Sequence, residues 1–248
     1  MCSSDLTALL GIATRLKLAR LIQIVPAGSP RVRPLAAAGF SGGADIVMLD
    51  EARSPARAEA STLAAVGAVA RETQGLTGHL GLPQRFAESY ADVVCLPPEA
   101  DDAARVRSVV GPWVQIGRRC LSTEAIDAAL ADPEIGFLLV GPGRDLLLHA
   151  SAVAPPSDPA SRPWFAVGGV THTSLDAVLR TGARRVAVGG AIVEASDPEA
   201  AAHAFKERLR QAWQDDPAME AVTMAAFNPG AGLTLAPEAD PSTTELRP

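Results

Sequence analysis

The sequence predicts an α/β fold, a single (β/α)8 barrel of the TIM type. Apolar, β-prone runs alternate with alanine-rich segments of helical periodicity along almost the whole chain. Such strict alternation predicts a parallel sheet covered by helices. Eight repeats close a barrel, whereas five or six leave an open, doubly wound sheet, and the number of runs favours the barrel. The eight expected strands are 19–26, 44–50, 76–81, 92–97, 113–118, 136–142, 164–170 and 185–192.

Several of the expected helices carry start signals. Ser54 and Asp197 each precede a proline, and Ser122 precedes another apolar-periodic run, so all three are expected N-caps. The segment 173–176 has the spacing of a capping box. The segment 144–161 is rich in proline and serine after its first turns, which predicts a short helix followed by a long loop.

The two ends of the chain differ from the repeating part. Residues 1–18 are expected to contain a short helix, over 6–18, that covers the bottom of the domain. The barrel itself is expected over 19–213. Residues 214–248 are rich in Pro, Asp, Glu, Thr and Ala with little apolar periodicity, which predicts a flexible, mostly disordered tail.

Composition excludes several classes of protein. The formal net charge is −6 and basic residues cluster no more densely than in pairs, so nucleic acid is not an expected partner. No apolar run is long enough to span a membrane, so a membrane is not an expected partner either. The cysteines (Cys2, Cys95 and Cys120) have no metal-binding spacing, and their odd number suits a reducing compartment. The first residues have the reverse of a secretory charge pattern. A cytoplasmic location is therefore expected.

The stretch 164–195 predicts a phosphate-binding site. Two short apolar runs end in double glycines, Gly168-Gly169 and Gly189-Gly190, with an amphipathic helical segment between them. Backbone N–H groups at glycine turns carry partial positive charge, and the absence of Cβ lets an oxyanion approach closely. In barrels of this kind the commonest phosphate site follows strands seven and eight.

Other polar residues fall at expected strand ends on the same face. His79 is the candidate general acid or base, because a histidine pKa suits proton transfer. A structural histidine satisfied by a neighbouring group is the alternative. Further candidates for ligand binding are Asp50, Arg118, Gly141 and His172. For Asp50, a salt bridge to a neighbouring loop is an equally good interpretation.

From 19 to about 210 the chain resembles thiamine phosphate synthase and its relative thiazole tautomerase. The matching sequence motifs are Ala-Asp-Ile-Val at 44–47, Ile-Gly-Arg at 116–118, Val-Gly-Pro at 140–142, Ala-Val-Gly-Gly-Val at 166–170, and the run 182–198. Their order and spacing together carry the resemblance. It implies a barrel enzyme of thiamine biosynthesis, a transferase that joins a phosphorylated thiazole to a pyrimidine pyrophosphate with the help of Mg²⁺.

The chain departs from that family where the pyrophosphate would bind. The family ends strand two with Gln-Leu-Arg-x-Lys, whereas 48–52 reads Met-Leu-Asp-Glu-Ala. Two positions that hold metal-binding acids in the family are Leu80 and Ala100 here. The lysines are Lys17 and Lys206, both on expected terminal helices. Mg²⁺ is therefore an expected cofactor only if synthase chemistry is retained.

Two functions remain open at this level. One is a divergent synthase that still catalyses the transfer. The other is a non-catalytic or repurposed barrel, a sensor or partner protein, that binds a small phosphorylated molecule. An isomerase or aldolase of another phosphate-binding barrel family is less favoured, because no expected strand carries a Schiff-base lysine. The sequence allows a homo-oligomer but does not predict one.

Overall fold

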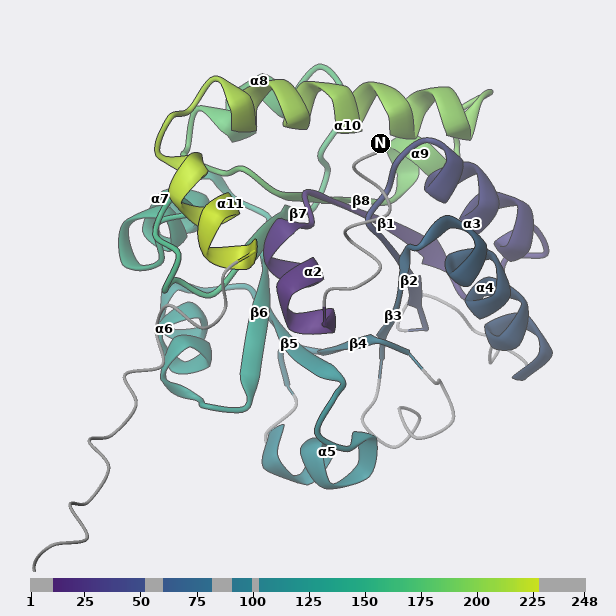
Figure 1. Cartoon of the computed structure of the whole chain (residues 1–248), viewed down its shortest axis with the longest axis horizontal. Coiled ribbons are helices and arrows are strands. Elements are labelled where there is room, and N and C mark those ends of the chain that lie inside the picture. Colours follow the sequence, from purple (N-terminus) through teal and green to yellow (C-terminus); the bar gives the residue numbers. More distant parts are fainter. Residues whose placement is uncertain (1–10, 52–59, 82–90, 100–102, 228–248) are drawn as a thin grey trace, which may run out of the picture.

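The computed structural model describes residues 11–51, 60–81, 91–99 and 103–227. Eight parallel strands form a closed barrel in chain order, with the helices around it (Figure 1). This confirms the (β/α)8 barrel that the sequence predicts. The strands are β1 (Leu21–Pro26), β2 (Ile46–Asp50), β3 (Leu76–Leu80), β4 (Val93–Leu96), β5 (Gln115–Cys120), β6 (Ile135–Val140), β7 (Trp164–Val167) and β8 (Val186–Val188).

The described helices follow the strands, and one of them covers an end of the barrel. Helix α2 lies across the opening in Figure 1, and its Leu16 is buried with the apolar side chains of the barrel interior. The part of the expected N-terminal helix that precedes residue 11 lies outside the described residues. The helices are α2 (Ile12–Leu18), α3 (Val32–Ser41), α4 (Ala60–Thr73), α5 (Ala103–Val110), α6 (Thr123–Ala131), α7 (Arg144–Val153), α8 (Leu175–Leu179), α9 (Gly190–Val193), α10 (Pro198–Gln214) and α11 (Met219–Phe227).

The predicted caps hold at two helices. The Ser122 hydroxyl accepts the Ala125 N–H at 3.2 Å, and the Asp197 carboxylate accepts the Ala200 N–H at 3.0 Å. Each cap satisfies an N–H that has no partner inside the helix. The third expected cap, Ser54, lies outside the described residues.

The expected capping box at 173–176 is displaced toward the N-terminus. The Thr171 N–H donates to the Ser174 hydroxyl at 2.9 Å, and the Ser174 N–H donates to the Thr171 hydroxyl at 3.2 Å. Helix α8 therefore begins after this reciprocal pair, at Leu175. In the 144–161 segment, α7 ends at Val153 and a loop follows, as the sequence predicts.

Side chains alternate between the inside and the outside of the barrel along each strand. Gly117 leaves room inside, because a Cβ there would lie 2.3 Å from the Phe137 ring. The Phe137 ring in turn meets Phe165 edge to face, with centroids 6.4 Å apart. One apolar cluster therefore fills the interior, and it includes Ile22, Ile46, Leu76, Val93, Phe137, Phe165 and Ala187.

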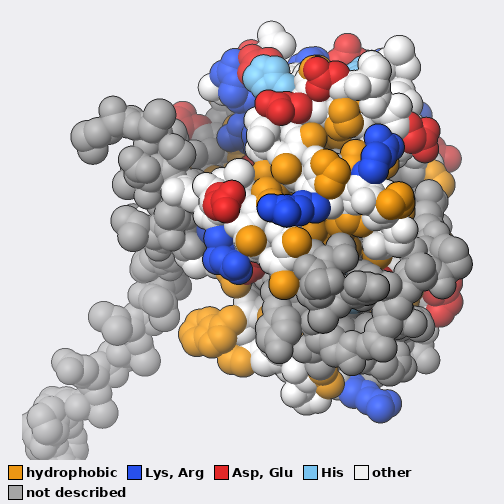
Figure 2. Space-filling view, turned by 90° about the vertical axis from the view of Figure 1, so that its right-hand side faces the viewer, with side chains coloured by type: hydrophobic (Ala, Val, Ile, Leu, Met, Phe, Trp, Pro, Cys, Tyr) orange, Lys and Arg blue, Asp and Glu red, His pale blue; other side chains and the backbone are white. Residues whose placement is uncertain are grey.

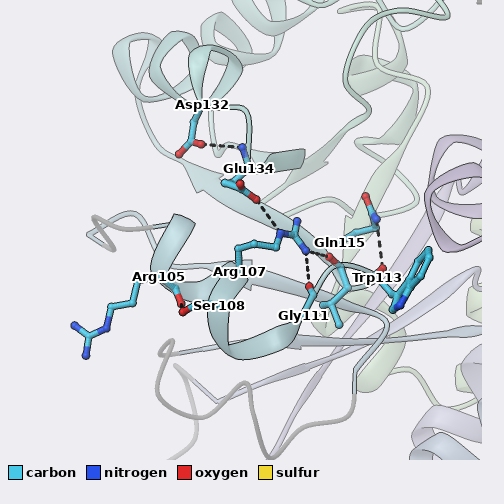
Figure 3. A network of polar contacts seen from close by, with 9 residues as sticks. Arg105, Arg107, Ser108, Gly111, Trp113, Gln115, Asp132 and Glu134 are labelled. Atoms are coloured by element: carbon cyan, nitrogen blue, oxygen red, sulfur yellow. Dashed lines mark hydrogen bonds and ion pairs between the residues drawn. The ribbon is translucent and has the colours of Figure 1, made fainter. Parts of the chain in front are cut away.

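Arg107 ties together the connections at the N-terminal ends of β5 and β6 (Figure 3). Its Nε lies 2.8 Å from the Glu134 carboxylate, and a terminal nitrogen donates to the carbonyls of Gly111 and Val114 at 2.8 and 2.7 Å. These bonds satisfy carbonyls where α5 ends and β5 begins. Trp113 lies in the same connection and is 80% exposed.

The molecular surface mixes charges and apolar groups. On the face over α3, α4 and α10, Figure 2 shows Lys and Arg side chains interspersed with acidic and hydrophobic ones. Within the described ranges, no helix is both long enough and apolar enough to cross a membrane.

The ordered chain extends beyond residue 213, which corrects the expected start of a flexible tail at 214. Helix α11 occupies Met219–Phe227, and Trp213, Met219 and Val222 form a small buried cluster. The Trp213 indole N–H donates to the Thr223 hydroxyl at 3.2 Å. The composition of this segment did not predict the helix, because the helix packs on α2 and on Trp213 of α10 and has no long amphipathic repeat of its own. Residues 228–248 lie outside the described residues.

Trp213 also anchors the bottom of the barrel. The Arg20 and Arg185 guanidinium carbons lie 4.7 and 5.0 Å from the centroid of its ring. Both arginines flank strands, at the start of β1 and before β8. Cation–π contacts and apolar burial therefore join α10 and α11 to the first and last strands.

We predict that Trp213→Ala lowers the free energy of unfolding by about 3–5 kcal/mol, the usual cost of removing a buried aromatic ring. Urea unfolding followed by circular dichroism measures the change. Trp113→Ala is the matched control, since this exposed ring should contribute within about 0.5 kcal/mol. Equal effects of the two substitutions would contradict the anchoring role of Trp213.

Candidate functional site

The two glycine corners line one cavity at the C-terminal mouth of the barrel. Gly168 and Gly169 follow β7, Gly189 and Gly190 follow β8, and the two strands pair in parallel. The cavity measures about 260 Å³. Its other lining residues are Ile24, Asp50, Leu80, Arg119, Leu139, Val167, Val170, Thr171, Ala187 and Ala191. The sequence-predicted corners therefore lie side by side at one site.

Close packing of β6 against β7 explains two of the glycines. A Cβ at Gly141 would lie 2.2 Å from the Val167 carbonyl oxygen, and one at Gly168 would lie 2.9 Å from the Pro142 Cβ. Both residues have positive φ, +127° and +100°, which disfavours side chains independently. Gly141, a candidate ligand-binding residue in the sequence, does not line the cavity and instead permits this contact.

The corners supply backbone donors to the cavity wall. The N–H groups of Gly169, Val170, Gly190 and Ala191 donate to no backbone carbonyl of the described chain. Adjacent N–H groups that lack acceptors form a concave surface suited to an anion. Phosphate, sulfate and carboxylate are the anions that such N–H groups bind in other proteins.

On β5, alternation selects Arg119 rather than Arg118. Arg119 lines the cavity, whereas Cys120 packs in the cluster between strands and helices. Arg118 shares the outward side with Cys120, because residues two apart on a strand face the same way. Ile116 packs in the same outward cluster as Cys120, and Gly117 faces the interior at Phe137, so the alternation holds along the whole of β5.

The two acidic residues at the end of β2, Asp50 and Glu51, also face opposite sides of the barrel wall. Asp50 lines the cavity and is 4% exposed. Glu51 instead lies with its carboxylate oxygen 3.3 Å from the His79 Nε2. Asp50 therefore belongs to the mouth and Glu51 to the contact with β3.

His79 faces away from the mouth. It pairs in register with Leu49, which packs in the cluster under α3 and α4, while the next residue, Leu80, lines the cavity. The imidazole is 1% exposed and in contact with Glu51. Its placement does not support the predicted role as acid or base at the mouth and matches the structural alternative.

The remaining histidines also meet protein groups. The exposed His172 ring stacks on Phe205 of α10, with centroids 3.8 Å apart, and does not line the cavity. His149 on α7 lies 2.8 Å from the Asp127 carboxylate on α6. The structure thus gives the predicted ligand-binding role of His172 no support.

Comparisons with known proteins agree with this geometry. No protein-family profile matches the chain. It is 35% identical over 189 residues to the thiamine-phosphate synthase of Acidothermus cellulolyticus, covering 70% of this chain and 85% of that protein. The enzyme of the same name from Saccharopolyspora erythraea is 31% identical over 219 residues, covering 80% and 96%. The chain belongs to the thiamine-phosphate synthase family.

Solved structures agree on the barrel. A thiamine phosphate pyrophosphorylase from Pyrococcus furiosus superposes with a TM-score of 0.67 at 22% identity, covering 80% of this chain and 98% of the other. A KDPGal structure gives a TM-score of 0.63, also at 22% identity, covering 78% and 96%. At this identity the likeness shows the fold alone.

Both lysines of this thiamine-phosphate synthase family member lie away from the mouth. Lys206 binds Asp45 at 2.5 Å, next to the start of β2, and Lys17 of α2 donates to the Pro159 carbonyl at 3.1 Å. Asp45 also accepts the backbone N–H groups of Arg20 and Leu21. The Lys206 ammonium and these bonds lower the pKa of Asp45 despite the opposing effect of its burial. These contacts hold both ammonium groups at the N-terminal end of the barrel.

The described side chains do not form a magnesium site by themselves. Within the described ranges, no three His, Cys, Asp or Glu side chains gather closely enough to hold a metal ion. Among the lining residues that the structure describes, Asp50 is the one carboxylate. The position of Ala100, which the resemblance compares with a metal-binding acid, lies outside the described residues.

Two cysteines pack on opposite faces of the barrel wall near the mouth. Cys95 belongs to the interior cluster and Cys120 to the cluster beneath the helices. Burial raises the pKa of both thiols, that of Cys120 to about 12. Both are therefore protonated at neutral pH, and neither is a nucleophile in the folded protein.

We predict that Cys95 and Cys120 resist iodoacetamide at pH 8 in the native protein, because a thiol with a pKa near 12 is only about 0.01% thiolate there. Mass spectrometry of the alkylated peptides measures the modification. Both cysteines should react in urea, which serves as the control. Rapid native labelling of either residue would show that its surroundings are open.

Proposed function

We propose that this chain is a thiamine-phosphate synthase-like barrel of thiamine biosynthesis that binds the phosphate of a phosphorylated thiazole at its C-terminal mouth. The convergence of Gly168-Gly169 and Gly189-Gly190 on one cavity carries the proposal. Backbone amides at both corners favour an anion, and the lack of side chains lets a phosphate approach them.

The floor of the cavity suits a small heterocycle. It is built from aliphatic side chains on five strands, and these continue directly into the apolar barrel interior. A ring placed on this floor would bury apolar surface, while the phosphate on the same ligand stays at the rim. The floor residues are Ile24, Leu80, Leu139, Val167 and Ala187.

The other half of the synthase reaction is less well supported. A pyrophosphate leaving group needs cations where its negative charge develops. Here Asp50 lines the mouth where the resemblance implies a basic residue, and both lysines lie at the opposite end. We therefore propose that the function is to bind the phosphorylated thiazole. A repurposed, non-catalytic barrel is the form of this function that requires no cations for a pyrophosphate.

We predict that hydroxyethylthiazole phosphate raises the melting temperature and that the unphosphorylated alcohol raises it much less. A ligand at about 100 times its Kd adds about 2.7 kcal/mol to the free energy of unfolding. Thermal unfolding at several ligand concentrations gives both affinities. Equal stabilisation by the two compounds would show that the protein does not recognise the phosphate group.

Gly189→Ala tests the corner directly. A Cβ there meets only Ile24, at 3.6 and 3.8 Å, so the methyl group fits the fold but occupies space at the phosphate wall. We expect the affinity for the phosphorylated compound to fall at least about tenfold, the loss of one or two amide–phosphate contacts. Gly67→Ala in α4 is the matched control, since it should leave binding unchanged and slightly stabilise the helix. Unchanged affinity in Gly189→Ala would contradict the site.

The catalytic alternative has its own test. The purified protein is incubated with hydroxyethylthiazole phosphate, the pyrimidine pyrophosphate and Mg²⁺, and thiamine phosphate is measured by chromatography. We expect no product above the uncatalysed reaction. Product formed with turnover would identify the chain as an active transferase and leave the phosphate site in place.

A further inference from the structure

Arg119 is the one lysine or arginine among the described residues that line the mouth cavity. Its Nε is buried without a hydrogen-bond partner, and the side chain forms no hydrogen bond or ion pair with any described residue. A guanidinium carries five N–H donors and keeps its charge at any physiological pH. A buried guanidinium N–H without an acceptor is unfavourable, so the site is suited to receive an anion that accepts from it, although Asp50 lines the same cavity.

The sheet register places Arg119 on the same side of the mouth as the glycine corners. Arg119 pairs with Leu139 on β6, and Leu139 pairs with Phe165 on β7, two residues before Val167. Leu139 and Val167 are both floor residues of the cavity. The Arg119 side chain therefore rises from the same floor. Strand β6 is the one strand between β5 and β7, and β7 leads into Gly168-Gly169.

The glycine corners and Arg119 supply different parts of an anion site. Backbone amides contribute oriented partial charges but no formal charge. A phosphate monoester carries close to two negative charges above its second pKa of about 6. Among the described lining residues, only Arg119 balances this charge with a formal positive charge.

We propose that Arg119 is the charge-selecting residue of the mouth, which pairs with the ligand's phosphate and makes the site specific for the dianionic form of a phosphate monoester. The inference rests on the proposed function, because it assumes that the phosphate lies at the glycine corners. It assigns selection to a residue on β5, while the corners of β7 and β8 set the position of the phosphate.

Arg119→Gln and Arg118→Gln form a matched pair on one strand. Affinity for hydroxyethylthiazole phosphate and for its alcohol is measured by calorimetry from pH 5 to pH 8. We expect Arg119→Gln to weaken phosphate binding about 10- to 100-fold, with the alcohol unchanged, because a charge-assisted bond is lost. Arg118→Gln, with the same charge change on the outward side, should stay within about twofold of the original protein.

The pH dependence separates charge selection from a structural effect. In the original protein, phosphate affinity should fall as pH drops through about 6, where the ligand becomes a monoanion. Arg119→Gln should flatten this dependence, because the cation that distinguishes the two ligand forms is gone. Equal weakening of phosphate and alcohol would overturn charge selection.

Gly189→Ala keeps the two proposals distinguishable. If Gly189→Ala loses phosphate binding but Arg119→Gln does not, the inference about Arg119 is wrong and the glycine site stands. If neither substitution changes phosphate binding, the proposed function itself fails, and Arg119 with it. Melting curves of all variants without ligand confirm that each one is folded.

Discussion

The closed parallel sheet imposes one constraint on which the rest of this structure depends. Successive side chains on each strand face opposite sides, and in a barrel one side is the interior while the other lies under the helices. Both sides are buried, so a polar residue near a strand end has one of two fixed environments. Asp50 and Arg119 face the mouth, whereas Glu51, His79 and Arg118 fall on the other side.

The same constraint produces the glycine corners. Strand β7 ends beside β6, and the chain turns where the Val167 carbonyl and Pro142 leave no room for a Cβ at Gly141 or Gly168. Part of the glycine pattern therefore serves packing. Gly169 and Gly189 have no such close neighbour, since a Cβ would meet nothing within 4 Å at the first and only Ile24 at the second. Their side of the corner is open to the cavity, and it is the part available to a ligand.

Charge is distributed unevenly between the two ends of the barrel. Lys17, Lys206, Arg20 and Arg185 lie at the N-terminal end, where they hold α2, α10 and α11 by bonds to carbonyls, to Asp45 and to Trp213. At the mouth, Arg119 and Asp50 are the charged lining residues that the structure describes. The cations at the bottom of the barrel thus join structural elements, whereas Arg119 is the one cation among the described residues that line the mouth.

The sequence by itself determined the barrel, the positions of its eight strands and the two corners, because periodicity and paired glycines are local signals. The differences from the synthase family motif at 48–52 could also be identified from the sequence. Only the tertiary structure decided that Arg119 and not Arg118 faces the mouth and that His79 does not. Regular alternation along β5 and β3 sets these outcomes once the inward-facing residues of each strand are known, and packing against the neighbouring strands and helices decides which residues those are. Helix α11 was likewise decided by tertiary contact, since its burial against Trp213 stabilises a segment whose own composition resembles a tail.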